Sequence, residues 1–256
     1  MMGPMEKKWA LITGASSGIG AATAEKLAAA GYNLVLTARR LQRLETLKKN
    51  LQERAKVEII LAGFDMRQPK EIQNFLRDQA STLKNLDVLV NNAGLAKGIE
   101  KFQEANLEDW DMMLETNVRG LLYMTRGIVP WMIERGGGHI VNMGSVAGRW
   151  VYPGGSVYCA SKFAVRAISE GLRQDLVGKN IRVSNIEPGM VDTEFSLVRM
   201  GSQQKADAVY AGMKPLTAED IAETISWVLS RPAHINVQEL VVYPTAQAHI
   251  GLVHRN

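Results

Sequence analysis

The sequence predicts a doubly wound α/β fold, in which helices cover both faces of a seven-stranded parallel sheet. The first observation is that short apolar runs alternate with longer tracts of helical periodicity from end to end. The second is that several short runs are apolar throughout, without the polar alternation of a strand that faces water. The third is that neither a repeat nor a linker rich in Pro, Gly or Ser divides the 256 residues, so we expect a single domain over residues 1–256.

Local signals place the elements in chain order. We expect strands at residues 8–13, 33–37, 57–64, 86–90, 139–143, 181–186 and 240–243. We expect helices at residues 18–30, 41–54, 69–83, 106–135, 157–177 and 217–230. Leucines recur at helical spacing in the second of these helices, and Pro69 suits the first turn of the third. Thr217 and Asp220 occupy the positions of a capping box at the start of the last.

Two segments outside the regular pattern are candidates for special roles. Residues 187–216 form a long irregular tract, and a loop of that length inside a compact domain is usually functional. Its part from 194 to 212 mixes apolar and polar residues, which suits a partly helical lid that closes over a substrate. The tail of residues 244–256 contains the apolar residues Ile250, Leu252 and Val253. We hypothesise that this tail packs on a neighbouring subunit.

The composition excludes several kinds of protein and site. One cysteine rules out an intrachain disulfide framework and favours a reducing, cytoplasmic location. The net charge of +4 is dispersed, whereas nucleic-acid binders cluster basic residues on one face, so we expect no nucleic-acid partner. No apolar stretch approaches the roughly 18 residues of a membrane span, and residues 1–8 lack the hydrophobic segment of a secretory signal. We interpret residues 1–5 as partly a cloning remnant or an alternative start.

A glycine-rich segment lies between the first strand and the first helix. It comprises residues 13–20, with the sequence TGASSGIG. Glycines there permit a tight turn and bring a pyrophosphate close to backbone amides at the start of the helix, where the helix dipole favours negative charge. The alternative is a turn whose glycines serve only strand–helix packing. The position between a strand and a helix favours a dinucleotide site.

The residues after the second strand favour NADP over NAD. An acidic residue about 20 positions beyond the glycine turn usually holds the 2′-hydroxyl of NAD, whereas the 2′-phosphate of NADP needs a cation. Ala38 stands where that acid is expected, and Arg39 and Arg40 follow it. Guanidinium groups bind phosphate through paired donors. The alternative is that both arginines are solvated charges at the start of the next helix.

Three residues form a candidate acid/base group. Tyr158 and Lys162 are four positions apart in a predicted helix, so both project from one face. The pKa of free tyrosine, about 10, is too high for an efficient base at neutral pH, and a neighbouring ammonium with an oxidised nicotinamide lowers it. Ser145 comes just after a predicted strand. Ligands bind at the carboxyl ends of parallel strands, so the Ser145 hydroxyl can hold a substrate oxygen. The alternatives are that Tyr158 and Lys162 are an ordinary pair on one helical face, and that Ser145 is only a turn residue.

These motifs occur together and in order, with residues 91–94 (NNAG) and Asn117 between the glycine turn and Ser145. In this combination the chain resembles the short-chain dehydrogenases/reductases over essentially its full length. Within that family it is most similar to NADP-dependent 3-hydroxy acid dehydrogenases that also oxidise serine and allo-threonine. The stretches that carry this resemblance are residues 90–96, 120–126, 186–191, 193–196 and 232–255. It implies a Rossmann fold and a homotetramer.

The resemblance also implies roles for individual residues. Tyr158 is the acid/base, Ser145 orients and polarises the carbonyl, and Lys162 holds the nicotinamide ribose while lowering the pKa of the tyrosine. Asn117 anchors a water molecule that links Lys162 to solvent, and Asp65 meets the adenine amino group. The implied cofactor-binding residues are Gly14, Ser16, Ser17, Gly18, Ile19, Gly20, Arg39, Arg40, Asp65, Met66, Asn92, Gly94, Tyr158, Lys162, Pro188, Gly189, Val191 and Thr193.

The predicted function is hydride transfer between NADP and a small 3-hydroxy acid such as 3-hydroxypropionate, serine or allo-threonine, with malonic semialdehyde reduced in reverse. Arg199 in the lid is a candidate partner of the substrate carboxylate; the alternative is a solvent-facing arginine. One alternative function is reduction of another carbonyl, such as a 3-oxoacyl chain, a diketone or a xenobiotic ketone. Another is a non-catalytic NADP-sensing protein.

Several conspicuous residues are assigned no chemistry. The four histidines are scattered without the spacing of metal ligands, so we expect no metal. Cys159 is interpreted as a small buried residue. The predicted helices at residues 106–135 and 157–177 are apolar on more than one face, as expected of helices that pack against a symmetry mate. We assign to the core or a subunit interface Trp110, Trp131 and Trp150.

Overall fold

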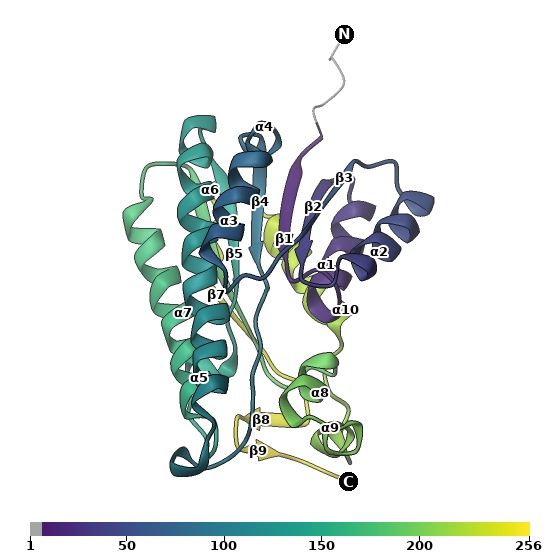
Figure 1. Ribbon diagram of the computed structural model, residues 1–256, viewed down its shortest axis with the longest axis vertical. Helices are drawn as coiled ribbons and strands as arrows, with labels where there is room; N and C mark the ends of the chain where they lie inside the picture. Colours follow the sequence, from purple (N-terminus) through teal and green to yellow (C-terminus); the bar gives the residue numbers. More distant parts are fainter. Residues whose placement is uncertain (1–6) are drawn as a thin grey trace.

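Seven strands form one parallel sheet in the computed structural model, in the order β3-β2-β1-β4-β5-β6-β7 (Figure 1). The structure describes residues 7–256, so the interpretation of residues 1–5 lies outside the described residues. The strands are β1 (Trp9–Thr13), β2 (Asn33–Ala38), β3 (Ile59–Gly63), β4 (Leu86–Asn91), β5 (Gly138–Met143), β6 (Ile181–Pro188) and β7 (Glu239–Val242). Each strand pairs in parallel with its neighbours, which confirms the predicted fold class.

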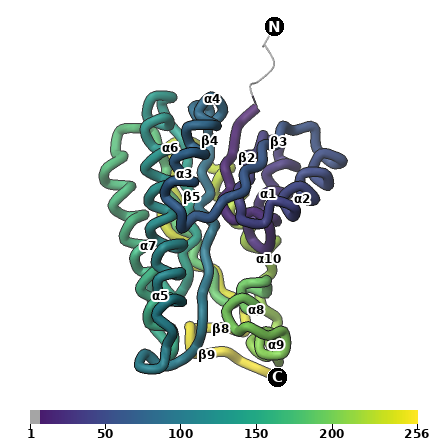
Figure 2. The backbone as a smooth tube through the Cα atoms, viewed as in Figure 1, coloured from purple at the N-terminus to yellow at the C-terminus, as the bar shows by residue number. Residues whose placement is uncertain are grey.

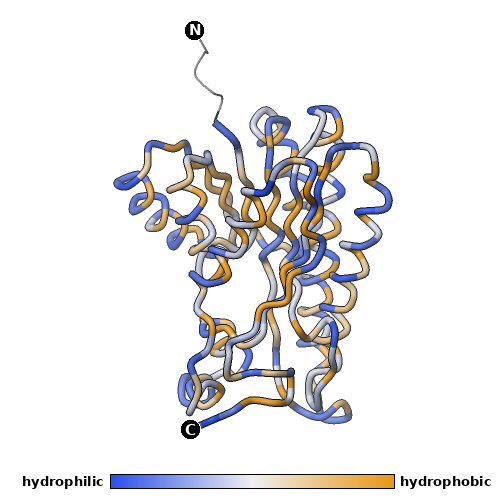
Figure 3. Tube along the Cα trace, turned by 180° about the vertical axis from the view of Figure 1, so that it is seen from behind, coloured by the Kyte–Doolittle hydropathy of each residue, from blue (hydrophilic) through white to orange (hydrophobic). Residues whose placement is uncertain are grey.

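Helices cover both faces of this sheet, because alternate strand residues point to opposite sides. Ala10 and Ile12 of β1 pack against one layer, and Leu11 between them packs against the other. The first layer contains α1 (Gly18–Ala29), α2 (Leu41–Arg54) and α10 (Ala218–Leu229). The second contains α3 (Pro69–Asp78), α4 (Ala80–Leu83), α6 (Leu121–Arg135) and α7 (Ser156–Asp175). Figure 3 shows the strands between these layers as the most hydrophobic part of the chain.

The helix expected at residues 106–135 is divided in the structure, which corrects that prediction. It consists of α5 (Leu107–Leu114), a π-helical segment (Glu115–Gly120) and α6. Asn106 caps α5 by accepting from the Glu108 amide at 2.9 Å. The buried Asn117 side chain lies in the π-helical segment and bonds to the backbone of Leu95 in another part of the chain. A π-bulge of this kind often marks a functional site.

The irregular tract at residues 187–216 contains two short helices, α8 (Glu194–Met200) and α9 (Gln203–Tyr210). Thr193 caps α8, because its hydroxyl accepts from the Phe195 amide at 3.3 Å. The capping box predicted for α10 is confirmed, with Thr217 and Asp220 exchanging side-chain and backbone bonds of 2.8 and 3.2 Å. Pro69 occupies the first turn of α3, also as predicted.

The tail folds onto the same chain, beside α9. It forms an antiparallel hairpin of β8 (Gln247–His249) and β9 (Leu252–Val253). The Arg255 guanidinium donates to the carbonyl of Val209 at 2.9 Å, and the Asn256 amide donates to the carbonyl of Gly212 at 2.8 Å. Figure 2 shows α8, α9 and this hairpin gathered below the carboxyl ends of the central strands. Within residues 7–256, no helix is long and apolar enough to cross a membrane.

Candidate active site

A cavity of about 750 Å³ lies where the carboxyl ends of the strands meet α8 and the tail hairpin. It brings together nearly all of the predicted site residues, which come from segments up to 185 positions apart along the chain, from Gly14 to Arg199. The predicted residues that line it are Gly14, Ser16, Ser17, Gly18, Ile19, Arg39, Arg40, Asp65, Met66, Asn92, Gly94, Ser145, Tyr158, Lys162, Pro188, Gly189, Val191, Thr193 and Arg199. Two predicted residues, Gly20 and Asn117, lie behind its wall.

The glycine turn is shaped so that only glycine fits at its key positions. Gly14 has a φ of +68° and Gly18 one of +55°, both in the left-handed region that side chains disfavour. A Cβ on Gly14 would lie 2.8 Å from the Ala93 Cα, so the turn touches the segment after β4. A Cβ on Gly20 would lie 2.5 Å from the Asn92 side chain, which assigns Gly20 to packing beneath the turn. This cradle fits the pyrophosphate of a dinucleotide.

The two arginines after β2 differ in their contacts. The Arg40 guanidinium donates to the hydroxyls of Ser16 and Ser17 at 2.7 to 3.2 Å and to the Glu194 carboxylate at 2.8 Å. Arg43 also bonds to Glu194. Burial acts to raise the pKa of Glu194, but the bonds from Arg43 and Arg40 outweigh it and lower that pKa to about 2. Arg40 therefore links the glycine turn to the first residue of α8.

Arg39 lines the cavity, and its guanidinium has no hydrogen-bond partner among residues 7–256. Of the two arginines, Arg39 therefore presents unpaired donors to the cavity. Asp65 also lines the cavity, but its carboxylate accepts two bonds from the Arg67 guanidinium, at 2.7 and 2.9 Å. Burial opposes the charge of Asp65, and the bonds from Arg67 prevail, so the pKa of Asp65 is lowered.

Ser145 and Tyr158 both line the cavity. Ser145 follows β5 and begins a 3-10 turn (Val146–Gly148), where its hydroxyl accepts from the Ala147 amide at 3.1 Å. Burial raises the pKa of Tyr158, and the nearby Tyr152 raises it further. The hydrogen bond with Ser145 and the charge of Arg199 act in the opposite direction. The lowered tyrosine pKa expected from the sequence is thus outweighed by burial in this structure.

Lys162 is buried one helical turn beyond Tyr158, as the spacing predicts. Its ammonium donates to the Met143 carbonyl at 2.8 Å and lies 5.9 Å from the centre of the Tyr158 ring. Burial lowers the pKa of Lys162 to about 8. Gly94 packs closely on Asn117, since a Cβ there would lie 3.2 Å from the Asn117 amide oxygen, and it would be in ordinary contact with the Lys162 ammonium at 3.6 Å.

Asn117 fixes the segment after β4 from behind the cavity wall. Its side chain donates to the Leu95 carbonyl at 2.8 Å and accepts from the Leu95 amide at 2.9 Å. The same amide group donates to the Ser161 hydroxyl at 3.0 Å. These bonds tie the π-helical segment to α7, between the catalytic candidates Tyr158 and Lys162 on that helix.

Arg199 of α8 points into the cavity, where it meets two tyrosines. Its guanidinium donates to the Tyr152 hydroxyl at 2.8 Å and to the Gly98 carbonyl at 3.2 Å. The guanidinium carbon lies 5.2 Å from the centre of the Tyr152 ring and 5.7 Å from that of Tyr158. The centre of the Phe195 ring lies 5.6 Å from the centre of the Tyr158 ring. A solvent-facing Arg199 is therefore excluded.

Sequence reasoning gave no individual role to several residues of the site. Tyr152, Glu194, Gln247 and Ile250 line the cavity without having been assigned a role there. Gln247 accepts from the Met190 amide at 2.9 Å, which places the tail against the segment after β6. Only Tyr152 carried a usable signal, because it lies close after Ser145 and just before the catalytic helix.

The residues assigned no chemistry remain outside this site. Cys159 is fully buried, as predicted. His139 is buried in β5 and bonded to the Ser184 hydroxyl at 2.9 Å. Trp110 packs with Phe102, with ring centres 4.7 Å apart. Among residues 7–256, no three His, Cys, Asp or Glu residues are grouped as metal ligands.

Comparisons with known proteins agree with this geometry. A family model for short chain dehydrogenases matches residues 8–202. The chain is 44% identical over 249 residues to the NADP-dependent 3-hydroxy acid dehydrogenase YdfG of Salmonella typhi, covering 96% of this chain and 99% of that protein. It is 46% identical over 240 residues to sulfoacetaldehyde reductase 2 of Chromohalobacter salexigens, covering 93% and 94%.

A solved structure extends the similarity to three dimensions. The closed form of a serine dehydrogenase complexed with NADP+ matches with a TM-score of 0.91 at 43% identity, covering 97% of this chain and 100% of that chain. The crystal structure of serine dehydrogenase from Escherichia coli matches with a TM-score of 0.81 at 39% identity, covering 94% and 100%. Both the sequence and the fold are matched over nearly the whole length. The chain therefore belongs to the short chain dehydrogenase family.

Proposed function

We propose that the protein is an NADP-dependent oxidoreductase that interconverts a small anionic hydroxy compound, above all a 3-hydroxy acid, and its carbonyl form. The observation that carries this proposal is the position of Arg199. Its guanidinium lies inside the cavity, 5.7 Å from the ring of Tyr158. A fixed cation at that distance from the acid/base suits a substrate whose anionic group is two or three bonds from the reacting carbon. The runner-up, reduction of a larger neutral ketone, gives Arg199 no anionic partner within the described residues.

The cofactor part of the proposal rests on the cradle at the glycine turn and on Arg39. Gly14, Gly18 and the start of α1 would hold the pyrophosphate, and Arg39 would meet the 2′-phosphate with its unpaired donors. Relatives with the same motifs are named as NADP-dependent or are complexed with NADP+. These relatives make a non-catalytic NADP-sensing role the weaker alternative.

In the proposed mechanism, NADP+ would accept the hydride during oxidation and NADPH would donate it during reduction. Tyr158 removes the hydroxyl proton during oxidation and returns a proton to the carbonyl oxygen during reduction. Ser145 donates a hydrogen bond to the same oxygen, since its side chain lines the same cavity as Tyr158. In this mechanism the Lys162 ammonium, one helical turn from Tyr158, favours the phenolate form of the tyrosine.

The anion site is compatible with a second substrate class. A sulfonate offers the same charge and acceptor oxygens as a carboxylate, and one relative is named as a sulfoacetaldehyde reductase. Arg199 and the Tyr152 hydroxyl can donate to either group. Isethionate is the alcohol that corresponds to sulfoacetaldehyde. It should therefore be assayed together with 3-hydroxypropionate for NADP reduction. Faster turnover of isethionate would favour the sulfonate as the substrate.

The proposal is tested by NADP reduction with 3-hydroxypropionate and with its neutral analogue 1,3-propanediol. We expect Arg199→Met to raise the KM for 3-hydroxypropionate roughly tenfold or more, since a charged hydrogen bond is lost, and to leave the KM for the diol within about twofold. Arg231→Met is the matched control, because Arg231 lies over Trp227 outside the cavity. Equal effects of Arg199→Met on both substrates would refute the anion site.

The assembly is a further part of this proposal. We propose a homotetramer, because α5, α6 and α7 expose large apolar side chains of the kind that subunit interfaces bury. These exposed residues are Leu107, Leu114, Leu122, Tyr123, Ile133 and Phe163. We also propose a cytoplasmic location, which the single cysteine leads us to expect. A further part of the proposal is that residues at about 187–216 form a lid over the substrate.

A further inference from the structure

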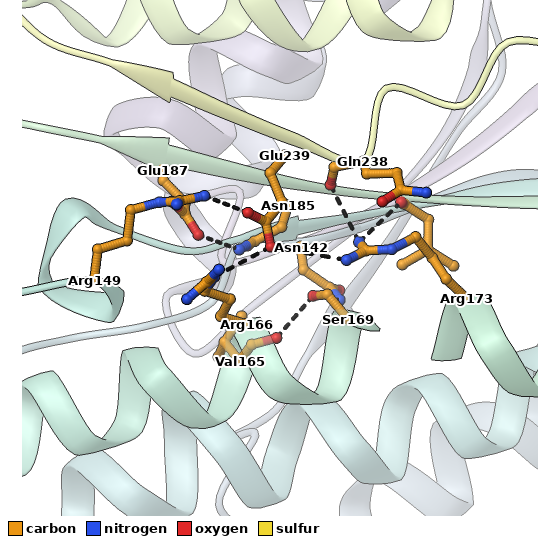
Figure 4. Close-up of polar contacts among 11 residues, drawn as sticks. Asn142, Arg149, Val165, Arg166, Ser169, Arg173, Asn185, Glu187, Gln238 and Glu239 are labelled. Carbon is orange, nitrogen blue, oxygen red and sulfur yellow. Dashed lines mark hydrogen bonds and ion pairs between the residues drawn. The ribbon is translucent and has the colours of Figure 1, made fainter. Parts of the chain in front are cut away.

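A network of ion pairs around one fully buried carboxylate joins the turn after β5 to β6, β7 and α7 (Figure 4). Its centre is Glu187, whose side chain is fully shielded from solvent near the end of β6. Arg149 bonds to the carboxylates of both Glu187 and Glu239. Arg166 of α7 reaches only Glu239, at 3.2 Å, and Arg173 lies 3.8 Å from the same carboxylate. Arg149 is therefore the one member of this group, within residues 7–256, that bridges both carboxylates.

Arg149 ends the short turn that Ser145 begins. The Gly148 amide donates to the Ser145 carbonyl at 2.8 Å, and the Arg149 amide donates to the Val146 carbonyl at 3.0 Å. The turn also packs tightly on α7, because a Cβ on Gly148 would lie 2.7 Å from the Lys162 carbonyl oxygen. A shift of the Arg149 side chain would therefore move the backbone that sets the position of the Ser145 hydroxyl.

Glu187 touches the same segment from its other end. A Cβ on Gly144, the residue before Ser145, would lie 2.9 Å from the Glu187 Cγ. It would also lie 2.5 Å from the amide oxygen of Asn185, whose nitrogen donates to Glu187 at 2.6 Å. Glu187 thus contacts the chain immediately before Ser145 and, through Arg149, holds the chain four residues after it.

Burying the Glu187 carboxylate has an unfavourable free energy, so we expect this network to have a role. A carboxylate taken out of water is unfavourable unless it is paired and hydrogen-bonded. Burial raises the pKa of Glu187, and the bond from Arg149 is the main effect that opposes it. Glu187 also directly precedes Pro188 and Gly189, which line the cavity. The ion pair therefore connects the two sides of the site, at the ends of β5 and β6.

We infer that Arg149 and Glu187 are positioning residues, which hold the Ser145 turn in its reactive alignment with Tyr158. This inference rests on the proposed function, because it assigns Ser145 the carbonyl-polarising role. Neither residue lines the cavity, and both act through the backbone of residues 144–149. A small displacement of a polarising hydroxyl lowers the rate of the chemical step far more than it weakens binding.

The test compares Arg149→Met with Arg149→Lys and with Arg166→Met. Arg166→Met is the matched control, because it removes a partner of Glu239 and leaves the bond of Arg149 to Glu187 in place. For Arg149→Met we expect kcat to fall roughly tenfold to a hundredfold, the KM for the hydroxy acid and the Kd for NADP to stay within about threefold, and the deuterium isotope effect to rise. Arg149→Lys should recover part of kcat, since it keeps a cation for Glu187.

A second readout does not need activity. Hydrogen exchange in the unloaded protein should quicken at the amides of Gly148 and Arg149 in Arg149→Met and stay unchanged in Arg166→Met. If Arg149→Met does not fold, Glu187→Gln replaces it in both measurements. The inference would be overturned if kcat and hydrogen exchange were unchanged in Arg149→Met. It would also be overturned if Arg166→Met lost as much kcat as Arg149→Met. Absence of hydride transfer in the unmutated protein, with the exchange difference present, would overturn the proposed function and leave only the positioning of the turn.

Discussion

At the residue scale, the catalytic candidates could be predicted because their chemistry depends on short-range spacing. Tyr158 and Lys162 are one helical turn apart, and Ser145 follows directly on a strand, so local sequence suffices to bring them to one place. The pKa values of these groups could not be predicted in the same way, because they depend on burial, which the whole fold determines. The sequence suggested a lowered tyrosine pKa, whereas burial raises the pKa of Tyr158 and lowers that of Lys162 to about 8.

The lowered pKa of Lys162 has a measurable consequence. Because folding lowers this pKa from 10.5 to about 8, the ammonium in the folded protein loses its proton as pH rises through about 8. Lys162 is proposed to bind the nicotinamide ribose, so NADP affinity should fall roughly tenfold across that pH. Fluorescence titration of NADP from pH 7 to 9 measures this. In Lys162→Met the affinity should be lower at pH 7 and flat across the range; the same pH dependence in both proteins would disprove the assignment.

At the scale of elements, the strands and most helices follow from the sequence because apolar periodicity is local. The π-helical segment does not, since Asn117 forms it through bonds to Leu95 and Ser161, which are 22 and 44 positions away. The link between α8 and α2 could not be predicted either. Arg40 and Glu194 are 154 positions apart, and nothing near either residue marks the other as a partner.

This link predicts that Glu194 competes with the 2′-phosphate of NADP for Arg40. Removing the carboxylate in Glu194→Gln should strengthen NADP binding about fivefold, as expected for a partly exposed ion pair, and leave NAD binding unchanged. Titration of both coenzymes measures the difference, since they differ only in the 2′-phosphate. Glu45→Gln is the control, because it removes a carboxylate of α2 that has no ion pair within the described residues. Equal changes in the affinities for NAD and NADP would show that Glu194 does not compete with the 2′-phosphate and only holds α8 in place through its ion pairs.

At the scale of the whole molecule, the parallel sheet explains why residues from six separate segments meet in one cavity. Parallel strands place all their carboxyl ends at one edge, so the loops after β1, β2, β3, β4, β5 and β6 converge there. The sequence therefore predicts which loops form the site. It does not predict how α8, α9 and the tail hairpin close it, because those contacts join residues such as Gln247 and Met190 across long loops.

The central claim is that this cavity moves a hydride between NADP and a small hydroxy acid with Tyr158 as the acid/base. The most direct test is single-turnover formation of NADPH from NADP and 3-hydroxypropionate by the unmutated protein and by Tyr158→Phe. We predict that the substitution lowers the rate by about 10² to 10⁴, the usual contribution of a positioned proton transfer, while the Kd for NADP changes less than about threefold. A rate in Tyr158→Phe within a few fold of the unmutated protein would contradict the account.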